Sequence, residues 1–275
     1  MSSVDQRTLR FKVQNITSLP TIPANVKRLL SLMEKPKITL DEFSRFVAND
    51  PALTVKVLKM VNSAFYGFPG RISSVSHAIM LLGLNVLKGL LLGVSVCEMM
   101  EKSMVGLWEH SLRCAVAARS IALRKGMKKP DEVSVAALLH DIGKVILILE
   151  FSEVYAEALR DAEDKEIIIT EAELLHFAEP HAGVGRLLFE RWNFPANLVE
   201  IVAFHHKPQL AKLAPLETAI VHFSDILVRA RGLGFAGDSF IPAVHPASFE
   251  RLQLTEKDLE EILSELEASA EIATP

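Results

Sequence analysis

Cysteine is scarce in this chain of 275 residues, which has only Cys97 and Cys114. Two cysteines without close spacing provide neither a disulfide framework nor a zinc site built from thiolates. The chain has nine histidines and 34 acidic residues. We therefore expect any bound metal to rest on histidine and carboxylate side chains.

An excess of positive charge is also missing. The chain has 30 Lys and Arg residues against 34 Asp and Glu residues, which gives a formal net charge of −4. Domains that bind nucleic acids usually carry a basic surface. A nucleic-acid partner is therefore disfavoured.

Segments typical of export or of membrane insertion are absent as well. The amino terminus is polar and has no apolar core of a signal peptide. The most apolar stretch, residues 78–96, is interrupted by Asn85, Lys88 and glycines, and a central lysine costs about 2.5–3.5 kcal/mol on insertion scales. We expect two short buried helices that meet near Gly83, no membrane contact and a cytoplasmic location.

Alternation of apolar and polar residues, the mark of strands, is not convincing anywhere, and the β-branched run at residues 167–169 is too short for a sheet. Helical periodicity and helix-start signals recur instead, and they predict an all-α fold. These predicted starts are Thr39 with Glu42, Asp50 with Pro51, Thr170 with Glu173, and Thr255 with Asp258.

Three stretches rich in glycine, proline or charge interrupt the helical pattern, at residues 64–70, 101–106 and 232–246. We place a boundary near residue 100, between an N-terminal helical subdomain (residues 1–100) and a second one (101–275). The aromatic turn at 64–70 is expected to be an exposed surface for a partner or another domain. Residues 232–246 are expected to form a long surface loop.

Eight of the nine histidines lie in the second subdomain, and several of them neighbour acidic residues within apolar helical segments. Neutral imidazole and carboxylate together suit one or two divalent ions, with iron, manganese and zinc as candidates. The candidate metal ligands are His110, His140, Asp141, His181, His205, His206 and Asp225. The remaining histidines, His77, His176, His222 and His245, are expected to be ordinary core or surface residues.

Two residues are candidates for catalysis, the ligand Asp141 and the nearby Lys144. Asp141 is adjacent to a ligand histidine and could bridge two ions, and such a pair can activate water for attack on a phosphoester. Lys144 lies one helical turn further on the same face, where it could offset phosphate charge. The alternatives are a solvated lysine and a coincidental set of histidines.

The order His, His-Asp, His, His-His, Asp resembles the HD superfamily of metal-dependent phosphohydrolases, whose fold is a helical bundle around the metal site. The segment Leu138 to Lys144, LLHDIGK, is the most specific part. The first subdomain is similar to the HDOD family, the HD-related output domain. The segments that carry this similarity are LPTIP at 19–23, DPAL at 50–53, VNSA at 61–64, SSV at 73–75 and LG at 82–83.

The resemblance implies a bacterial signal-transduction output module with a signalling protein as partner. In this family many members have lost metal ligands, whereas every HD-type ligand position is filled here. The alternative is an active metal-dependent phosphohydrolase with a nucleotide or phosphodiester ligand. Cyclic-di-GMP is disfavoured as substrate, because Lys207 and Pro208 follow the His-His pair where the related phosphodiesterases have an acidic residue and a Gly-Tyr-Pro motif. Whether the chain is an enzyme is left open.

Overall fold

The chain folds into helices throughout the part that its structure, a computed structural model, describes: residues 3–18, 21–63, 66, 68 and 71–269. Within these ranges there is no strand, and one isolated bridge joins Val4 to Phe177. The predicted all-α fold is confirmed. No helix in the described ranges is long and apolar enough to cross a bilayer.

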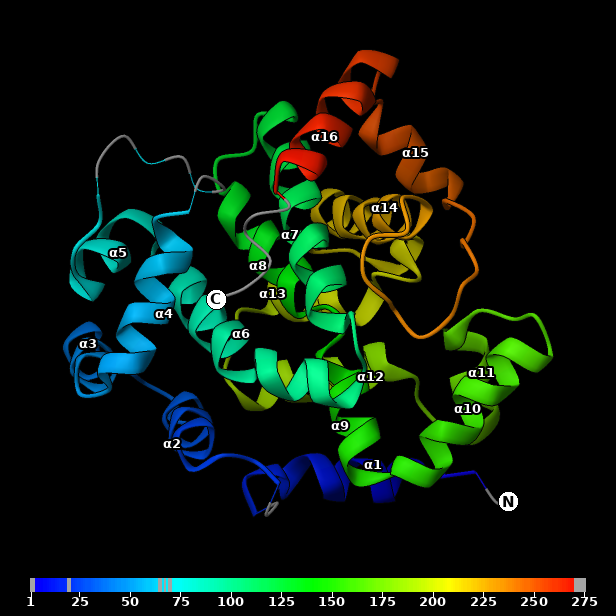
Figure 1. Cartoon of the computed structure of the whole chain (residues 1–275), viewed down its shortest axis with the longest axis horizontal. Coiled ribbons are helices and arrows are strands. Elements are labelled where there is room, and N and C mark those ends of the chain that lie inside the picture. Colours follow the sequence, from blue (N-terminus) through cyan, green and yellow to red (C-terminus); the bar gives the residue numbers. More distant parts are fainter. Residues whose placement is uncertain (1–2, 19–20, 64–65, 67, 69–70, 270–275) are drawn as a thin grey trace.

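The first helices of the chain lie along its lower edge and on one side (Figure 1). They are α1 (Gln6–Gln14), α2 (Ala24–Met33), α3 (Leu40–Ala48), α4 (Pro51–Val61) and α5 (Val75–Leu82), with a short 3-10 turn, η1 (Ile16–Ser18). The long helix α6 (Leu84–Ser103) follows and runs through the middle of the molecule.

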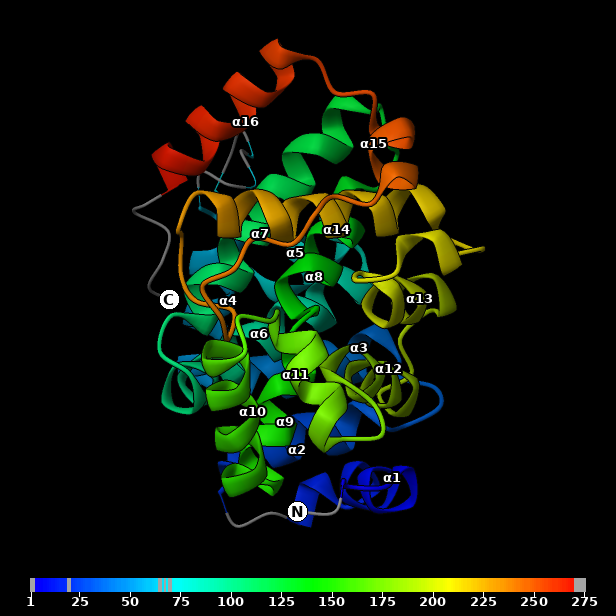
Figure 2. The same cartoon turned by 90° about the vertical axis from the view of Figure 1, so that its right-hand side faces the viewer.

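The helices that follow α6 form a second set, in which α7, α8 and α14 pack against one another, and α15 and α16 lie at the end opposite α1 (Figure 2). They are α7 (Leu107–Arg124), α8 (Pro130–Leu139), α9 (Ile142–Glu150), α10 (Ser152–Asp164), α11 (Ile169–His176), α12 (His181–Arg191), α13 (Ala196–Phe204), α14 (Pro215–Ala230), α15 (Pro246–Leu252) and α16 (Glu256–Ala268), with the 3-10 turn η2 (Pro208–Leu210).

Three of the four predicted helix starts are confirmed. The Thr39 and Asp50 side chains accept hydrogen bonds from the backbone N–H groups of α3 and α4, and Pro51 is the first residue of α4. Thr255 and Asp258 form a full capping box at α16. The fourth start, Thr170 with Glu173, is wrong: Ile168 is the N-cap of α11 and the helix begins at Ile169, so Thr170 lies inside the helix.

The turn between α4 and α5 is pinned by Asn62, which ends α4. Its amide Nδ2 donates to the carbonyl oxygens of Leu58 and Ile72, and its Oδ1 accepts from the Ile72 N–H. Most of the aromatic segment 64–70 lies outside the described residues. Tyr66 is described, and it is buried beneath the guanidinium of Arg119, so at this residue the predicted exposed surface is wrong.

Helices α5 and α6 meet at Gly83, as predicted, where φ is +83°, a conformation that favours glycine. Helix α6 is much longer than the predicted short segment. It packs against α2, α4 and α5 as well as against α7, α8 and α9, so it contacts both sets of helices. Its Lys88 is buried, and its ammonium donates to the carbonyl oxygen of Trp192 at 3.3 Å. Burial lowers the pKa of this lysine.

The amino terminus returns to the second set of helices. Val4 pairs with residues 176–178 through two backbone hydrogen bonds, and α1 packs against α12.

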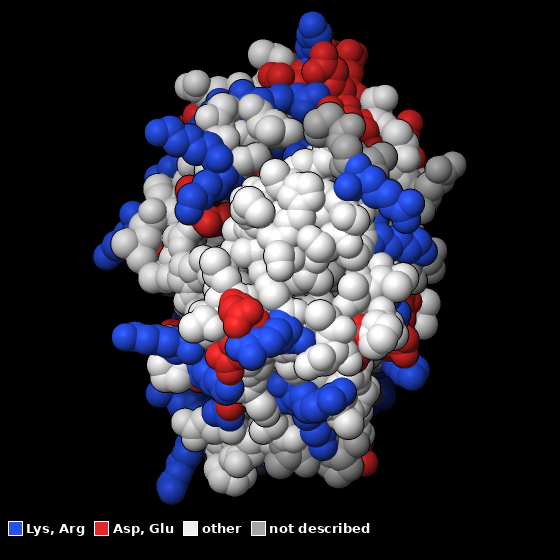
Figure 3. Space-filling model, turned by 90° about the vertical axis from the view of Figure 1, so that its left-hand side faces the viewer, with Lys and Arg blue, Asp and Glu red and all other residues white. Residues whose placement is uncertain are grey.

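Two apolar side chains of the first helices are exposed, those of Val55 in α4 and Met80 in α5, the latter by 80%. Figure 3 shows the face that carries α3, α4 and α5, with a broad uncharged area bordered by lysine and arginine.

Glycines set the spacing between α6 and α8. A Cβ atom at Gly89 would lie 2.0 Å from Cγ1 of Val135. We therefore predict that Gly89→Ala lowers the free energy of unfolding by about 1–3 kcal/mol through overpacking. In urea unfolding, the double variant Gly89→Ala/Val135→Ala should be destabilised by less than the sum of the two single variants. Additive costs would contradict this packing.

Candidate metal centre

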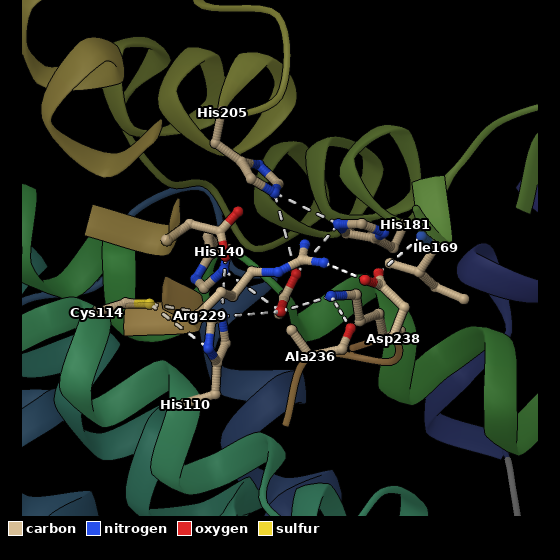
Figure 4. A network of polar contacts seen from close by, with 12 residues as sticks. His110, Cys114, His140, Ile169, His181, His205, Arg229, Ala236 and Asp238 are labelled. Atoms are coloured by element: carbon tan, nitrogen blue, oxygen red, sulfur yellow. Dashed lines mark hydrogen bonds and ion pairs between the residues drawn. The ribbon is translucent and has the colours of Figure 1, made fainter. Parts of the chain in front are cut away.

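The seven predicted ligands converge within the second set of helices. Figure 4 shows four of them, His110, His140, His181 and His205, pointing toward one another. The seven residues come from five segments of the fold, and each segment lies within a helix or at the end of one. These are His110 in α7, His140 and Asp141 between α8 and α9, His181 at the start of α12, His205 and His206 after α13, and Asp225 in α14.

The donors fall into two groups of four, and in each group the ligand atoms lie within 4.8 Å of one another. One group contains His110, Cys114, His140 and Asp225, and the other contains Asp141, His181, His205 and His206. Seven of these eight residues are at most 1% exposed. The side chain of His206 is 16% exposed, so it alone of the eight reaches solvent.

Asp141 lies between the two groups. Its Oδ1 is 3.1 Å from His181 Nε2, and its Oδ2 is 3.4 Å from His140 Nε2 and 3.7 Å from His110 Nε2. The two oxygens of one carboxylate therefore face different histidines. This is the arrangement expected of a carboxylate that links two sets of ligands.

A close crossing of α9 and α12 brings Asp141 to His181. A Cβ atom at Gly143 would lie 2.0 Å from the carbonyl oxygen of His181. Only a residue without a side chain permits this backbone contact. The glycine of the LLHDIGK segment is thus required by the geometry of the site.

The imidazole rings are oriented by hydrogen bonds at their outer nitrogens. Nδ1 of His140 lies 2.6 Å from the Ala137 carbonyl oxygen, and Nδ1 of His205 lies 2.7 Å from that of Val202. A proton on Nδ1 leaves the lone pair of Nε2 free to bind a metal ion. In both rings Nε2 faces the other ligand residues. Ligand histidines in metalloproteins are commonly held in this way.

Glu173 of α11 holds the third ring and was not predicted as a site residue. Its Oε2 accepts from His181 Nδ1 at 2.7 Å and from the His181 backbone N–H at 2.9 Å, and its Oε1 accepts from the Tyr155 hydroxyl. The sequence suggested a capping residue, because Glu173 follows Thr170 at capping-box spacing. The carboxylate instead turns inward toward α12.

Lys144 is buried and paired, so it is not the solvated lysine that the sequence left as an alternative. Its Nζ donates to Asp141 Oδ2 at 2.7 Å and to the carbonyl oxygen of Ala236 at 2.8 Å. Ala236 belongs to the loop between α14 and α15, which was predicted to be a plain surface loop. Part of that loop lies over the site.

The loop is fastened at two further points. Asp238 pairs with Arg229 of α14 and accepts from the backbone N–H of Ile169 at 2.8 Å. Phe235 N–H donates to the Gly106 carbonyl oxygen at 3.0 Å, just before α7. The loop is thereby tied to three of the elements that surround the ligands.

The histidines expected to be ordinary lie outside the two donor groups. His77 is exposed and His176 pairs with Asp161. His222 is buried, and its Nδ1 contacts the carbonyl oxygen of His205 at 2.7 Å, while its Nε2 accepts from the His245 N–H. His222 therefore supports a predicted ligand, which the sequence pattern did not reveal.

The electrostatics favour the metal-binding protonation states of Asp141 and His205, but not that of His181. Burial opposes ionisation of Asp141, but the neighbouring His140 and Lys144 hold its pKa well below the usual range. Burial and then the nearby His140 lower the pKa of His205. His181 differs, because burial lowers its pKa but Glu173 and Asp141 together outweigh burial and raise it. Ionised carboxylates and neutral imidazoles are the forms that act as ligands.

The donor set fits a divalent metal. Among the described residues, the buried atoms His140 Nε2 and Asp225 Oδ2 have no hydrogen-bond partner, and such atoms are costly unless something binds them. The buried carboxylates of Asp141, Asp225 and Glu173 carry three negative charges against one positive charge on Lys144. A bound divalent ion would reduce this excess of negative charge.

Comparison with known proteins identifies the family. The family model described as HDOD domain matches residues 19–208. The chain belongs to the HDOD family. An uncharacterized protein of Treponema pallidum is 26% identical over 199 residues, which is 70% of this HDOD chain and 38% of that protein. The chain thus spans well under half the length of this curated relative.

Solved structures share the fold. A crystal structure of an HDOD domain protein with unknown function from Geobacter sulfurreducens has a TM-score of 0.67 and 27% identity, and covers 97% of this chain and 96% of that one. A proposed signal transduction protein from Marinobacter aquaeolei VT8 has a TM-score of 0.69 at 19% identity, over 95% of this chain and 60% of that one.

The position of Glu173 generates a test of the site. We predict that Glu173→Gln weakens zinc binding by a factor of about 10–100, as is typical when the hydrogen-bond partner of a ligand histidine is altered. Competition with a chromogenic chelator measures the affinity. Glu157→Gln is the matched control, because Glu157 lies near the non-ligand His176. Equal affinities for the two variants would count against the role of Glu173.

Proposed function

We propose that this HDOD chain is a bacterial signal-transduction output module that holds divalent metal in a closed HD-type site. The proposed ligands are the seven predicted ones, His110, His140, Asp141, His181, His205, His206 and Asp225. Iron, manganese or zinc would suit them, as one ion or two. The metal would act as a structural or sensory element, and a signalling protein would be the partner. A cytoplasmic location is part of the same proposal.

The burial of the donors is the observation that carries this proposal. Catalytic metal sites keep a ligand position open for water or substrate. Here all of the donors except His206 are at most 1% exposed, and the loop between α14 and α15 is bonded to Lys144 above them. A closed site suits a metal that stabilises one conformation of the fold.

The second candidate function is a metal-dependent phosphohydrolase for a nucleotide or phosphodiester. The observation in its favour is Asp141, whose two oxygens face different donors, as in sites where one carboxylate links two ions. In this alternative Asp141 would be a bridging ligand and Lys144 would neutralise phosphate charge. Lys144 would first have to leave Ala236, so the loop would have to move.

Metal content and stability test the proposed site. We expect protein purified without added metal to contain a divalent ion by elemental analysis, and Asp141→Ala to lose it. A chelator should lower the stability of the wild type by about 2.7 kcal/mol relative to free metal at 100 times its Kd. His140→Ala should abolish this difference, whereas the exposed control His77→Ala should preserve it. A metal-free wild type that cannot be loaded would refute the proposal.

Hydrolysis assays separate the two candidates. With metal-loaded protein, we expect no chelator-sensitive turnover of nucleotides, cyclic dinucleotides or generic phosphoesters, because the donors are closed to substrate. Asp141→Ala controls for contaminating phosphatase. Turnover that disappears with both the chelator and Asp141→Ala would establish the phosphohydrolase and overturn the closed-site account.

A further inference from the structure

Cys114 lies one helical turn beyond His110 on α7 and points into the same cluster (Figure 4). Its side chain is fully buried, and its Sγ is 3.5 Å from His110 Nε2. The thiol is therefore next to the ring nitrogen that faces the other donors. The set of ligands predicted from histidines and carboxylates did not include it.

The distances in this group suit a shared ion. A tetrahedral ion that binds nitrogen at about 2.0–2.1 Å and sulfur at about 2.3 Å separates these two donors by roughly 3.5 Å. The observed separation is 3.5 Å for Cys114 Sγ and His110 Nε2, and 3.2 Å for His110 Nε2 and Asp225 Oδ1. All four donors of the group lie within the reach of one ion.

His140 supplies a second, independent observation. Its Nε2 is fully buried, belongs to the same group of four donors and has no hydrogen-bond partner among the described residues. Its Nδ1 is already engaged with Ala137. Asp141 Oδ2 lies 3.4 Å from this nitrogen without forming a hydrogen bond. The nitrogen therefore remains available for a ligand in the space that it shares with Cys114 Sγ.

The charge of the group also balances. A divalent ion bound by one thiolate, one carboxylate and two neutral imidazoles has no net charge, which suits a site sealed from water. Without the thiolate, the same ion would leave one positive charge within this group. Thiolate is also a softer ligand than imidazole or carboxylate, and it favours zinc over manganese or magnesium.

Cys97 provides the contrast within the same chain. It is buried too, but its Sγ donates to the carbonyl oxygen of Val94 in its own helix at 3.3 Å. Cys114 Sγ donates to the carbonyl oxygen of Ser224 at 3.9 Å, and it lies closer, at 3.5 Å, to His110 Nε2. Both thiols thus reach a backbone carbonyl oxygen, but only Cys114 also lies among metal donors.

We propose that Cys114 is a thiolate ligand of the ion held by His110, His140 and Asp225, and that it makes this half of the site selective for zinc. This inference rests on the proposed metal site. The thiol loses its proton to solvent or buffer when the metal–sulfur bond forms, and no redox change is involved. The other half of the site, around Asp141 and His181, has no sulfur donor among the described residues.

Cobalt substitution tests the thiolate directly. We expect wild-type protein and Cys97→Ser loaded with cobalt to show a near-ultraviolet thiolate-to-cobalt charge-transfer band, and Cys114→Ser to bind cobalt without this band. Zinc affinity of Cys114→Ser should fall by at least the roughly 10–100-fold typical of losing the partner of a ligand. Manganese affinity should change less.

X-ray absorption of zinc-loaded Cys97→Ser tests whether Cys114 binds the zinc ion, even if Cys114→Ser does not fold. A sulfur neighbour at about 2.3 Å supports the proposal, because Cys114 is then the only cysteine left. Stoichiometric metal with only nitrogen and oxygen neighbours, or a cobalt band that persists in Cys114→Ser, overturns it and leaves the metal site standing. Protein that binds neither cobalt nor zinc refutes the metal site as well.

Discussion

The carboxylate of Asp141 is fully buried, and the rest of the site is arranged around its charge. A buried carboxylate is costly unless charged or polar partners surround it. Lys144 contacts one oxygen, His181 contacts the other, and the rings of His140 and His110 lie within 4 Å. These partners come from α7, α9 and α12 and from the junction between α8 and α9. Compensating the charge of Asp141 therefore requires these helices to be correctly placed relative to one another.

The need to surround the Asp141 carboxylate with partners also explains why the site is closed. The contact of Gly143 with the His181 backbone draws α9 onto α12, and the loop between α14 and α15 reaches Lys144 through Ala236. A metal bound here would join helices that are far apart in sequence. Its gain or loss would therefore alter the stability of the whole second set of helices, because ligands that bind the folded state stabilise it. This is the physical basis of the proposed sensory or structural role.

The sequence predicted those features that depend on local order. The caps at Thr39, Asp50 and Thr255, the break at Gly83 and the all-α fold follow from neighbouring residues, and they are confirmed. The burial of Lys144 and the inward turn of Glu173 depend on how distant helices pack. A local pattern therefore left two interpretations of Lys144 open and misassigned Glu173. Cys114 was not predicted as a ligand, because closely spaced cysteines are the usual signal of a thiolate site and this chain has none. Its spacing of four residues from His110 on a helix nevertheless places both on one face.

The most direct measurement is a crystal structure of protein purified without added metal, with anomalous data collected at the iron, manganese and zinc absorption edges. The account predicts an anomalous peak between His110, His140 and Asp225, or beside Asp141 and His181, with Lys144 still close to Asp141. Ordered side chains with no anomalous peak in the cluster, in metal-free and metal-soaked crystals alike, would contradict it.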